Sequence, residues 1–183
     1  VGEVIEGWTR PNGLQIMKKR VPIGVIGIIY EARPNVTVDA VGLTLKSSNA
    51  VILRGSSSTL QSNQAIVKVL SEALFSVGFP AQTIQLITDP SRDTVAELVT
   101  CNQFVDLVIP RGGAGLIASV IQVSTVPCIE TGIGNCHVYV DKDASSEIVV
   151  PVVLNAKAQR PSVCNAAETL LVHSEVAERY LPD

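Results

Sequence analysis

Cys164 lies in the stretch of this sequence with the clearest capacity for chemistry. The stretch covers residues 155–168 and reads NAKAQRPSVCNAAE. Upstream apolar residues keep a helical spacing until Arg160-Pro161, where the proline forces the preceding residue out of the helical region. The thiol is therefore expected just past a helix, and Lys157 and Arg160 supply positive charge that favours thiolate over thiol. These features make Cys164 a candidate nucleophile.

Structural interpretations of the same residues stay open at this point. A free cysteine is more often a small buried hydrophobic residue than a nucleophile. Lys157 also fits a solvated helix face, and Arg160 fits a helix-end cation beside backbone carbonyls.

Composition limits the classes of function. With 183 residues, 46% of them hydrophobic, the chain can form one sizeable α/β domain plus part of another. A net charge of −3 and 17% charged residues argue against nucleic-acid and membrane partners. The four cysteines lack C-x-x-C spacing, which predicts reduced thiols in the cytoplasm. Because the chain starts at Val1 and ends within an unfinished pattern, we expect it to be part of a longer protein.

The order of apolar segments predicts an α/β fold built on a parallel sheet. The first 19 residues carry turn signals and fit an extended lead-in or a hairpin. Strand-length apolar runs then alternate with helical patterns, which implies parallel strands with right-handed crossovers. The expected strands are 25–30, 50–54, 83–88 and 105–109, and the expected helices are 36–46, 60–77, 91–101 (capped by Ser91 or Asp93) and 116–123.

A second group of elements is expected after residue 125. Residues 130–134 are interpreted as a turn that carries the chain between two domains. The other expected elements are short strands at 126–129 and 136–140, the helix before Cys164, a strand at 168–173 and the start of a helix at 174–181.

Polar or glycine-rich residues follow three of the predicted strands, at the edge where open α/β sheets bind ligands. Asn35 fits either a helix N-cap or a ligand-binding or oxyanion-binding residue. Arg54, Gly55 and Ser56 precede a helix whose first N–H groups suit a phosphate, although a strand-end arginine with a serine cap fits equally. Residues 110–113, PRGG, form a glycine-rich strand-to-helix turn without either usual nucleotide-binding pattern.

The remaining candidate side chains carry weaker signals. Glu130 fits a general base, but a lone glutamate is more often a solvated or capping residue. Cys128, Cys136 and His137 match no structural zinc spacing, so no metal site is predicted.

Four segments together carry a resemblance to a known family. They are VPIGVIGIIYEARPNVTVD at 21–39, KSSNAVILR at 46–54, IPRGGAGL at 109–116 and QRPSVCN at 159–165. In this order they resemble the gamma-glutamyl phosphate reductases, the proline-biosynthesis members of the aldehyde dehydrogenase superfamily. The resemblance covers essentially the whole chain, and members of the family are longer at both ends.

The resemblance implies a fold and a set of residue roles. It implies a three-layer, Rossmann-type NADP-binding domain over residues 1–130, and the beginning of a catalytic domain over residues 131–183. Cys164 matches the catalytic cysteine of the family, and Asn35 matches the asparagine that helps to hold the oxyanion.

Further roles follow from the same comparison. Arg54, Gly55 and Ser56 match the segment that holds the adenosine ribose and phosphate. Glu130 lies where oxidising aldehyde dehydrogenases carry a water-activating glutamate, which a reductase does not need. Arg160 is our candidate for binding an anionic substrate. The loop that replaces a Rossmann glycine fingerprint near the pyrophosphate and nicotinamide corresponds to Pro110, Arg111, Gly112 and Gly113.

The activity implied by the resemblance is the NADPH-dependent reduction of L-glutamyl 5-phosphate to L-glutamate 5-semialdehyde. Phosphate would leave and a thioester would form on the cysteine. The resemblance also implies a homo-oligomer, with glutamate 5-kinase as a candidate partner. Two alternatives stay open: an oxidising NAD(P)-dependent aldehyde dehydrogenase, and an inactive truncated nucleotide-binding module.

Two positions depart from the family pattern. Ser48 and Ser56 stand where we expect glycine. A serine tolerates a positive φ less well than glycine does, so the loop geometry at these positions, and with it cofactor affinity, is open to question.

Overall fold

The computed structural model describes residues 1–130, 132 and 134–181. The chain divides into two compact units, Val1–Thr131 and Gly132–Asp183, and each is described by itself. The predicted turn at 130–134 includes residues 131 and 133, which lie outside the described residues.

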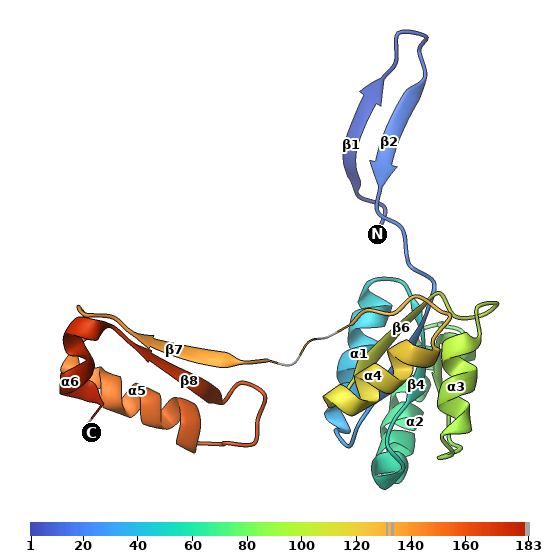
Figure 1. The fold of residues 1–183 in the computed structure, drawn as a ribbon. Helices are drawn as coiled ribbons and strands as arrows, with labels where there is room; N and C mark the ends of the chain where they lie inside the picture. Colours follow the sequence, from blue (N-terminus) through green and yellow to red (C-terminus); the bar gives the residue numbers. More distant parts are fainter. Residues whose placement is uncertain (131, 133, 182–183) are drawn as a thin grey trace. The chain divides into compact units, whose positions relative to one another are not determined.

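A four-stranded parallel sheet forms the centre of the first unit, in the order β5-β4-β3-β6. Four helices alternate with these strands along the chain (Figure 1). The strands are β3 (Val25–Tyr30), β4 (Ala50–Arg54), β5 (Ile84–Leu86) and β6 (Leu107–Arg111), and the helices are α1 (Asn35–Lys46), α2 (Leu60–Ser76), α3 (Asp93–Thr100) and α4 (Ala114–Val123). The predicted α/β class with a parallel sheet is confirmed.

Two hydrophobic clusters, one on each face of this sheet, make the unit three layers thick. Ile26, Ile28 and Tyr30 of β3 pack in one cluster with residues of α1 and α2. Ile29 of the same strand packs in the other cluster with residues of α3 and α4. Adjacent strand residues point to opposite faces, so the continuous apolar run of β3 is buried on both sides.

A β-hairpin precedes the sheet and confirms one of the two alternatives for the first 19 residues. Strand β1 (Val4–Thr9) pairs antiparallel with β2 (Gln15–Lys19), with a register shift between Val4 and Glu6. The turn between the strands places Gly13 at a φ of 84°, a conformation that favours glycine.

Several predicted boundaries differ from the structure. Strand β6 begins two residues later than expected, because Asp106 accepts the Val25 N–H through its carboxylate (2.8 Å) and donates its own N–H to the Val25 carbonyl (2.9 Å) before the strand starts. Residues 126–129 form no strand and contribute only an isolated bridge at Cys128. The cap of α3 is Arg92, so the predicted caps Ser91 and Asp93 are wrong.

The second unit contains one parallel strand pair and its crossover helix. Strand β7 (Cys136–Val140) lies beside β8 (Ala167–Val172), and α5 (Ser146–Ala158) connects them. A short η3 (Ser174–Val176) and α6 (Ala177–Tyr180) follow β8. The helix expected before the cysteine is thus confirmed, and it ends two residues before Arg160.

Candidate active site

The carboxyl ends of β3, β4 and β6 bring three of the predicted segments to one edge of the sheet. Ile29 pairs with Arg54, and Tyr30 pairs with Arg111. The residues that follow these strands therefore emerge side by side. This is the edge at which open parallel sheets bind their ligands.

Asn35 is exposed at the start of α1. Pro34 occupies the cap position, and no side chain makes a capping hydrogen bond there. The Asn35 amide instead donates to a carboxylate oxygen of Asp39 over 3.4 Å. The interpretation of Asn35 as the helix cap is therefore wrong, and its exposed amide is available to a ligand.

Arg54 is buried and braces the loop that leads to α3. Its guanidinium donates to the carbonyls of Pro90 (2.8 Å) and Ser91 (2.9 Å), and also to the carbonyl of Gly55. A longer contact of 3.5 Å reaches the Thr94 hydroxyl. This role was not predicted from the sequence, because Pro90 and Ser91 lie 36 and 37 positions away from Arg54 in the chain.

Gly55 lies against a buried polar network. A Cβ at this position would meet the Asn63 amide and approach the Tyr30 ring to 3.0 Å. The Tyr30 and Thr37 hydroxyls lie 2.7 Å apart, and Thr37 donates to the Asn63 side-chain oxygen over 3.2 Å. These hydroxyls and the Asn63 amide fix α1 and α2 against β3, so the backbone after β4 starts from a rigid position.

The two serines that replace expected glycines behave differently. Ser48 has a φ of 60°, the only positive value at a non-glycine position in the described part of the chain. Ser56 has a φ of −63°, which any residue adopts, and its hydroxyl accepts the Ser58 N–H over 3.3 Å as the cap of the short η1 (Ser57–Thr59). The concern about loop strain is confirmed for Ser48 and is wrong for Ser56.

The turn between β6 and α4 contains the predicted residues 110–113. Pro110 is buried within the strand, Arg111 is exposed, and Gly113 caps α4. The Gly113 N–H donates to a carboxylate oxygen of Glu31 over 3.0 Å, and the Glu31 N–H donates to the Arg111 carbonyl over 3.1 Å. Glu31 directly follows β3, and no role was predicted for it from the sequence.

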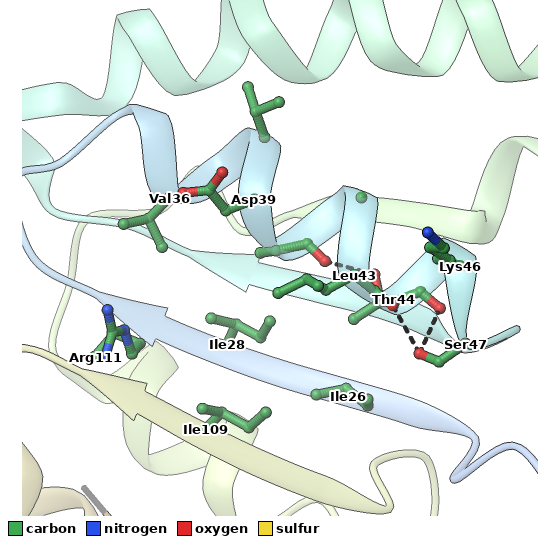
Figure 2. A pocket seen from close by; sticks show the side chains of 13 residues that line it. Ile26, Ile28, Val36, Asp39, Leu43, Thr44, Lys46, Ser47, Ile109 and Arg111 are labelled. Carbon is green, nitrogen blue, oxygen red and sulfur yellow. Dashed lines mark hydrogen bonds between the residues drawn. The ribbon is translucent and has the colours of Figure 1, made fainter.

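An open cleft of about 810 Å³ lies between α1 and the face of β3 and β6 that carries Ile26, Ile28 and Ile109. Figure 2 shows Ile28 and Ile109 on the strand side, Leu43 on the helix side, and Arg111 and Ser47 at opposite ends. The lining is mainly apolar. Among the predicted site residues, Arg111 is the one that this cleft includes.

Cys164 is exposed in the turn between α5 and β8, whereas the other three cysteines are half-buried. Lys157 lies in the last turn of α5, and Arg160 is exposed beyond the helix end. The Cys136 thiol donates to the Cys164 carbonyl oxygen over 3.3 Å, which ties the turn to the start of β7. The thiol of Cys164 is thus accessible on a backbone that is held in place.

The remaining candidates make local contacts. Glu130 is exposed. The His137 ring nitrogen Nδ1 lies 2.8 Å from the Asn135 carbonyl oxygen. Within residues 1–130, 132 and 134–181, no three His, Cys, Asp or Glu side chains gather as metal ligands would.

The predicted residues thus fall into two groups. Asn35, residues 54–56 and residues 110–113 belong to the first unit, around one sheet edge. Arg160 and Cys164 belong to the second unit, beside one strand pair.

Comparison with known proteins identifies the family. The sequence pattern of the aldehyde dehydrogenase family matches residues 2–183. The chain belongs to the aldehyde dehydrogenase family.

Comparison with individual family members shows a more specific similarity. The chain is 60% identical to the gamma-glutamyl phosphate reductase of Moorella thermoacetica and 58% identical to that of Heliobacterium modesticaldum, over 182 residues in each case. These alignments cover 100% of the chain and 44% of each relative. The crystal structure of gamma-glutamyl phosphate reductase from Thermotoga maritima superposes with a TM-score of 0.87 at 52% identity, again over 100% of this chain and 44% of that one.

The resemblance to gamma-glutamyl phosphate reductases is therefore confirmed, and the chain spans less than half the length of these aldehyde dehydrogenase family members. None of the helices in the described part of the chain combines the length and apolar character needed to cross a membrane.

Proposed function

We propose that this chain carries the cofactor-binding region and the nucleophile of an NADPH-dependent gamma-glutamyl phosphate reductase. The observation that carries the proposal is the 58–60% identity to proteins of that name along the whole chain. The exposed thiol of Cys164 in the turn after α5 supports it, because an acyl-transfer nucleophile must reach its substrate. The free thiols also agree with a cytoplasmic enzyme.

In this proposal the two units have different functions. Residues 1–130 bind the cofactor, and residues 131–183 begin the catalytic domain. Gly55, Ser56 and residues 110–113 lie at the edge where a nucleotide would bind. The absence of a Cβ at Gly112 leaves room for the Glu31 carboxyl group and a Leu116 methyl group beside this turn. Arg54 contributes by bracing the loop that leads to α3 as well as by its charge.

The chemistry of the chain's own residues starts at Cys164. Its thiolate attacks the carbonyl carbon of L-glutamyl 5-phosphate, and the new C–S bond forms as a tetrahedral oxyanion. The Asn35 amide donates a hydrogen bond to that oxyanion, and Arg160 binds an anionic group of the substrate. Collapse of the oxyanion breaks the C–O bond to phosphate and leaves a thioester on Cys164.

When NADPH is bound, it supplies the hydride that converts the thioester to L-glutamate 5-semialdehyde. Cysteine suits both halves of the reaction, because the thiolate is a good nucleophile and also leaves readily. Water must be kept from the thioester until reduction is complete.

The reverse reaction provides the test. We would measure NADP+ reduction by glutamate 5-semialdehyde with and without phosphate, using this chain and a chimera in which it replaces the matching segment of the Thermotoga maritima protein. Phosphate-dependent turnover that is lost in Cys164→Ser and kept in Cys101→Ser is expected. Turnover of the chimera without phosphate would instead indicate an oxidising aldehyde dehydrogenase.

Comparison of the chain with the chimera shows whether residues outside this sequence are needed for activity. An active chimera beside an inactive chain would show that residues outside this sequence are needed. Loss of activity in the chimera, with its fold and NADPH binding intact, would contradict the assignment.

A further inference from the structure

Glu31 forms the link between two strand ends at the proposed cofactor edge. Its carboxylate accepts the Gly113 N–H over 3.0 Å, and its own N–H donates to the Arg111 carbonyl over 3.1 Å. A Cβ on Gly112 would lie 2.6 Å from the Glu31 carboxyl carbon and 2.7 Å from a Leu116 methyl group. Backbone and side chain of one residue thus hold both sides of the glycine turn.

The Glu31 carboxylate lies at the N-terminus of α4, where a negative charge is favourable. Gly113 is the cap residue of α4, a helix of 10 residues, and it makes no capping contact through a side chain of its own. Helix N-termini attract negative charge, because their first N–H groups lack partners within the helix. Glu31 supplies that charge from the position just after β3, 82 residues away.

The same contacts restrict the conformations of the turn. Two adjacent glycines have more backbone freedom than any other residue pair, so Gly112 and Gly113 would sample many shapes without a tether. The bond to Gly113 N–H, together with the bond to the Arg111 carbonyl, selects one shape. A ligand that binds this turn would then not have to order it.

We propose that Glu31 is a positioning residue, whose carboxylate holds the turn of residues 110–113 in the shape that binds the nicotinamide cofactor. This inference rests on the proposed function. Glu31 acts through the turn and need not touch the cofactor. Because its carboxylate uses the Gly113 N–H, the cofactor phosphates bind to other donors at this edge.

Two variants separate the hydrogen bond from the charge. Glu31→Gln removes the charge but keeps an oxygen that accepts the Gly113 N–H, whereas Glu31→Ala removes both. Glu72→Gln, an exposed carboxylate on α2, serves as the control for a change in net charge. We would measure hydrogen exchange of the Gly113 amide by NMR in this chain, NADPH affinity in the chain and in the chimera, and the melting temperature of each variant.

Glu31→Ala is expected to speed exchange at Gly113 and to weaken NADPH binding by about tenfold, the fold-change that corresponds to loss of one capping bond. Glu31→Gln should retain slow exchange and bind NADPH at least as tightly as the unchanged protein. Glu72→Gln should change neither. Affinities are compared well below the melting temperature, where a loss of stability alone would leave NADPH binding unchanged.

Different results would contradict the role of Glu31 and the cofactor assignment. Unchanged exchange in Glu31→Ala, or equal NADPH affinity in both Glu31 variants and the unchanged protein, would overturn the role of Glu31. Failure of the unchanged chimera to bind NADPH, with the exchange pattern as expected, would overturn the cofactor assignment itself and this inference with it.

Discussion

Ser48 holds a backbone conformation that disfavours its own side chain. Its φ of 60° lies in the left-handed region, directly after the end of α1. An L-residue with a Cβ is disfavoured there, and glycine is not. The residue is exposed, so its side chain contributes little packing in return.

Substitution of this serine should stabilise the chain. Ser48→Gly is expected to raise the free energy of unfolding by about 0.5–1 kcal/mol. Ser56→Gly is the matched control, because Ser56 has an ordinary φ of −63° and caps η1; its replacement should lower the free energy by about 0.5 kcal/mol. Urea denaturation measures both. A change of the same sign in the two variants would contradict this explanation.

At the scale of elements, Arg54 joins the end of β4 to the segment before α3. Its guanidinium satisfies the carbonyls of Pro90 and Ser91, and a shorter side chain would leave both without this donor. Hydrogen bonds from a charged group contribute more than neutral ones.

Arg54→Met should lower the free energy of unfolding by about 2–3 kcal/mol, because it removes the donors and keeps much of the apolar stem. Arg54→Lys should cost less, since it keeps the charge but not the planar arrangement of donors. Denaturation and NADPH binding are measured together. Unchanged stability of Arg54→Met with weaker NADPH binding would show that Arg54 acts as a cofactor ligand alone.

Tyr30 gives the contact between β3 and α1 a dependence on pH. Burial raises the pKa of Tyr30 above its ordinary value of 10.0, and the contact with Thr37 offsets part of that increase. The neutral hydroxyl is the form that the folded state favours. Its contribution to stability is therefore fully present below pH 10.0 and is lost as pH rises through the higher pKa of the folded state.

Tyr30→Phe should cost about 1 kcal/mol at neutral pH, through loss of the hydroxyl contact. It should also weaken the fall in stability above pH 10.0, because the group that ionises is gone. Denaturation curves at neutral and alkaline pH provide the measurement, with Tyr180→Phe in the second unit as the control. An equally steep alkaline fall in Tyr30→Phe would contradict the argument.

At the scale of the whole molecule, local patterns predicted the repeating elements well. The bounds of β3, β4 and β7 agree with the predicted runs, because each is a segment of strand length rich in apolar and β-branched residues. The start of β6 was misplaced because the Asp106 side chain pairs with Val25, which is 81 residues away. A contact of that separation leaves no local signal.

In the candidate site, too, local features could be predicted from the sequence and long-range contacts could not. The exposure of Cys164 after a helix agrees with the spacing of Arg160 and Pro161, which is local information. The bracing by Arg54 and the tether from Glu31 join residues that are far apart in the chain, so the sequence could not predict them. Position at a strand end was the available signal for both residues.

The most direct test of the central claim is to trap the acyl group on Cys164. The chimera would be incubated with glutamate 5-semialdehyde and NADP+ without phosphate, quenched in acid, and analysed by peptide mass spectrometry. The account predicts one glutamyl group on the peptide that contains Cys164, its disappearance when phosphate is added, and no label in Cys164→Ser. Phosphate-dependent turnover without any acylation of Cys164, or acylation of a different cysteine, would contradict it.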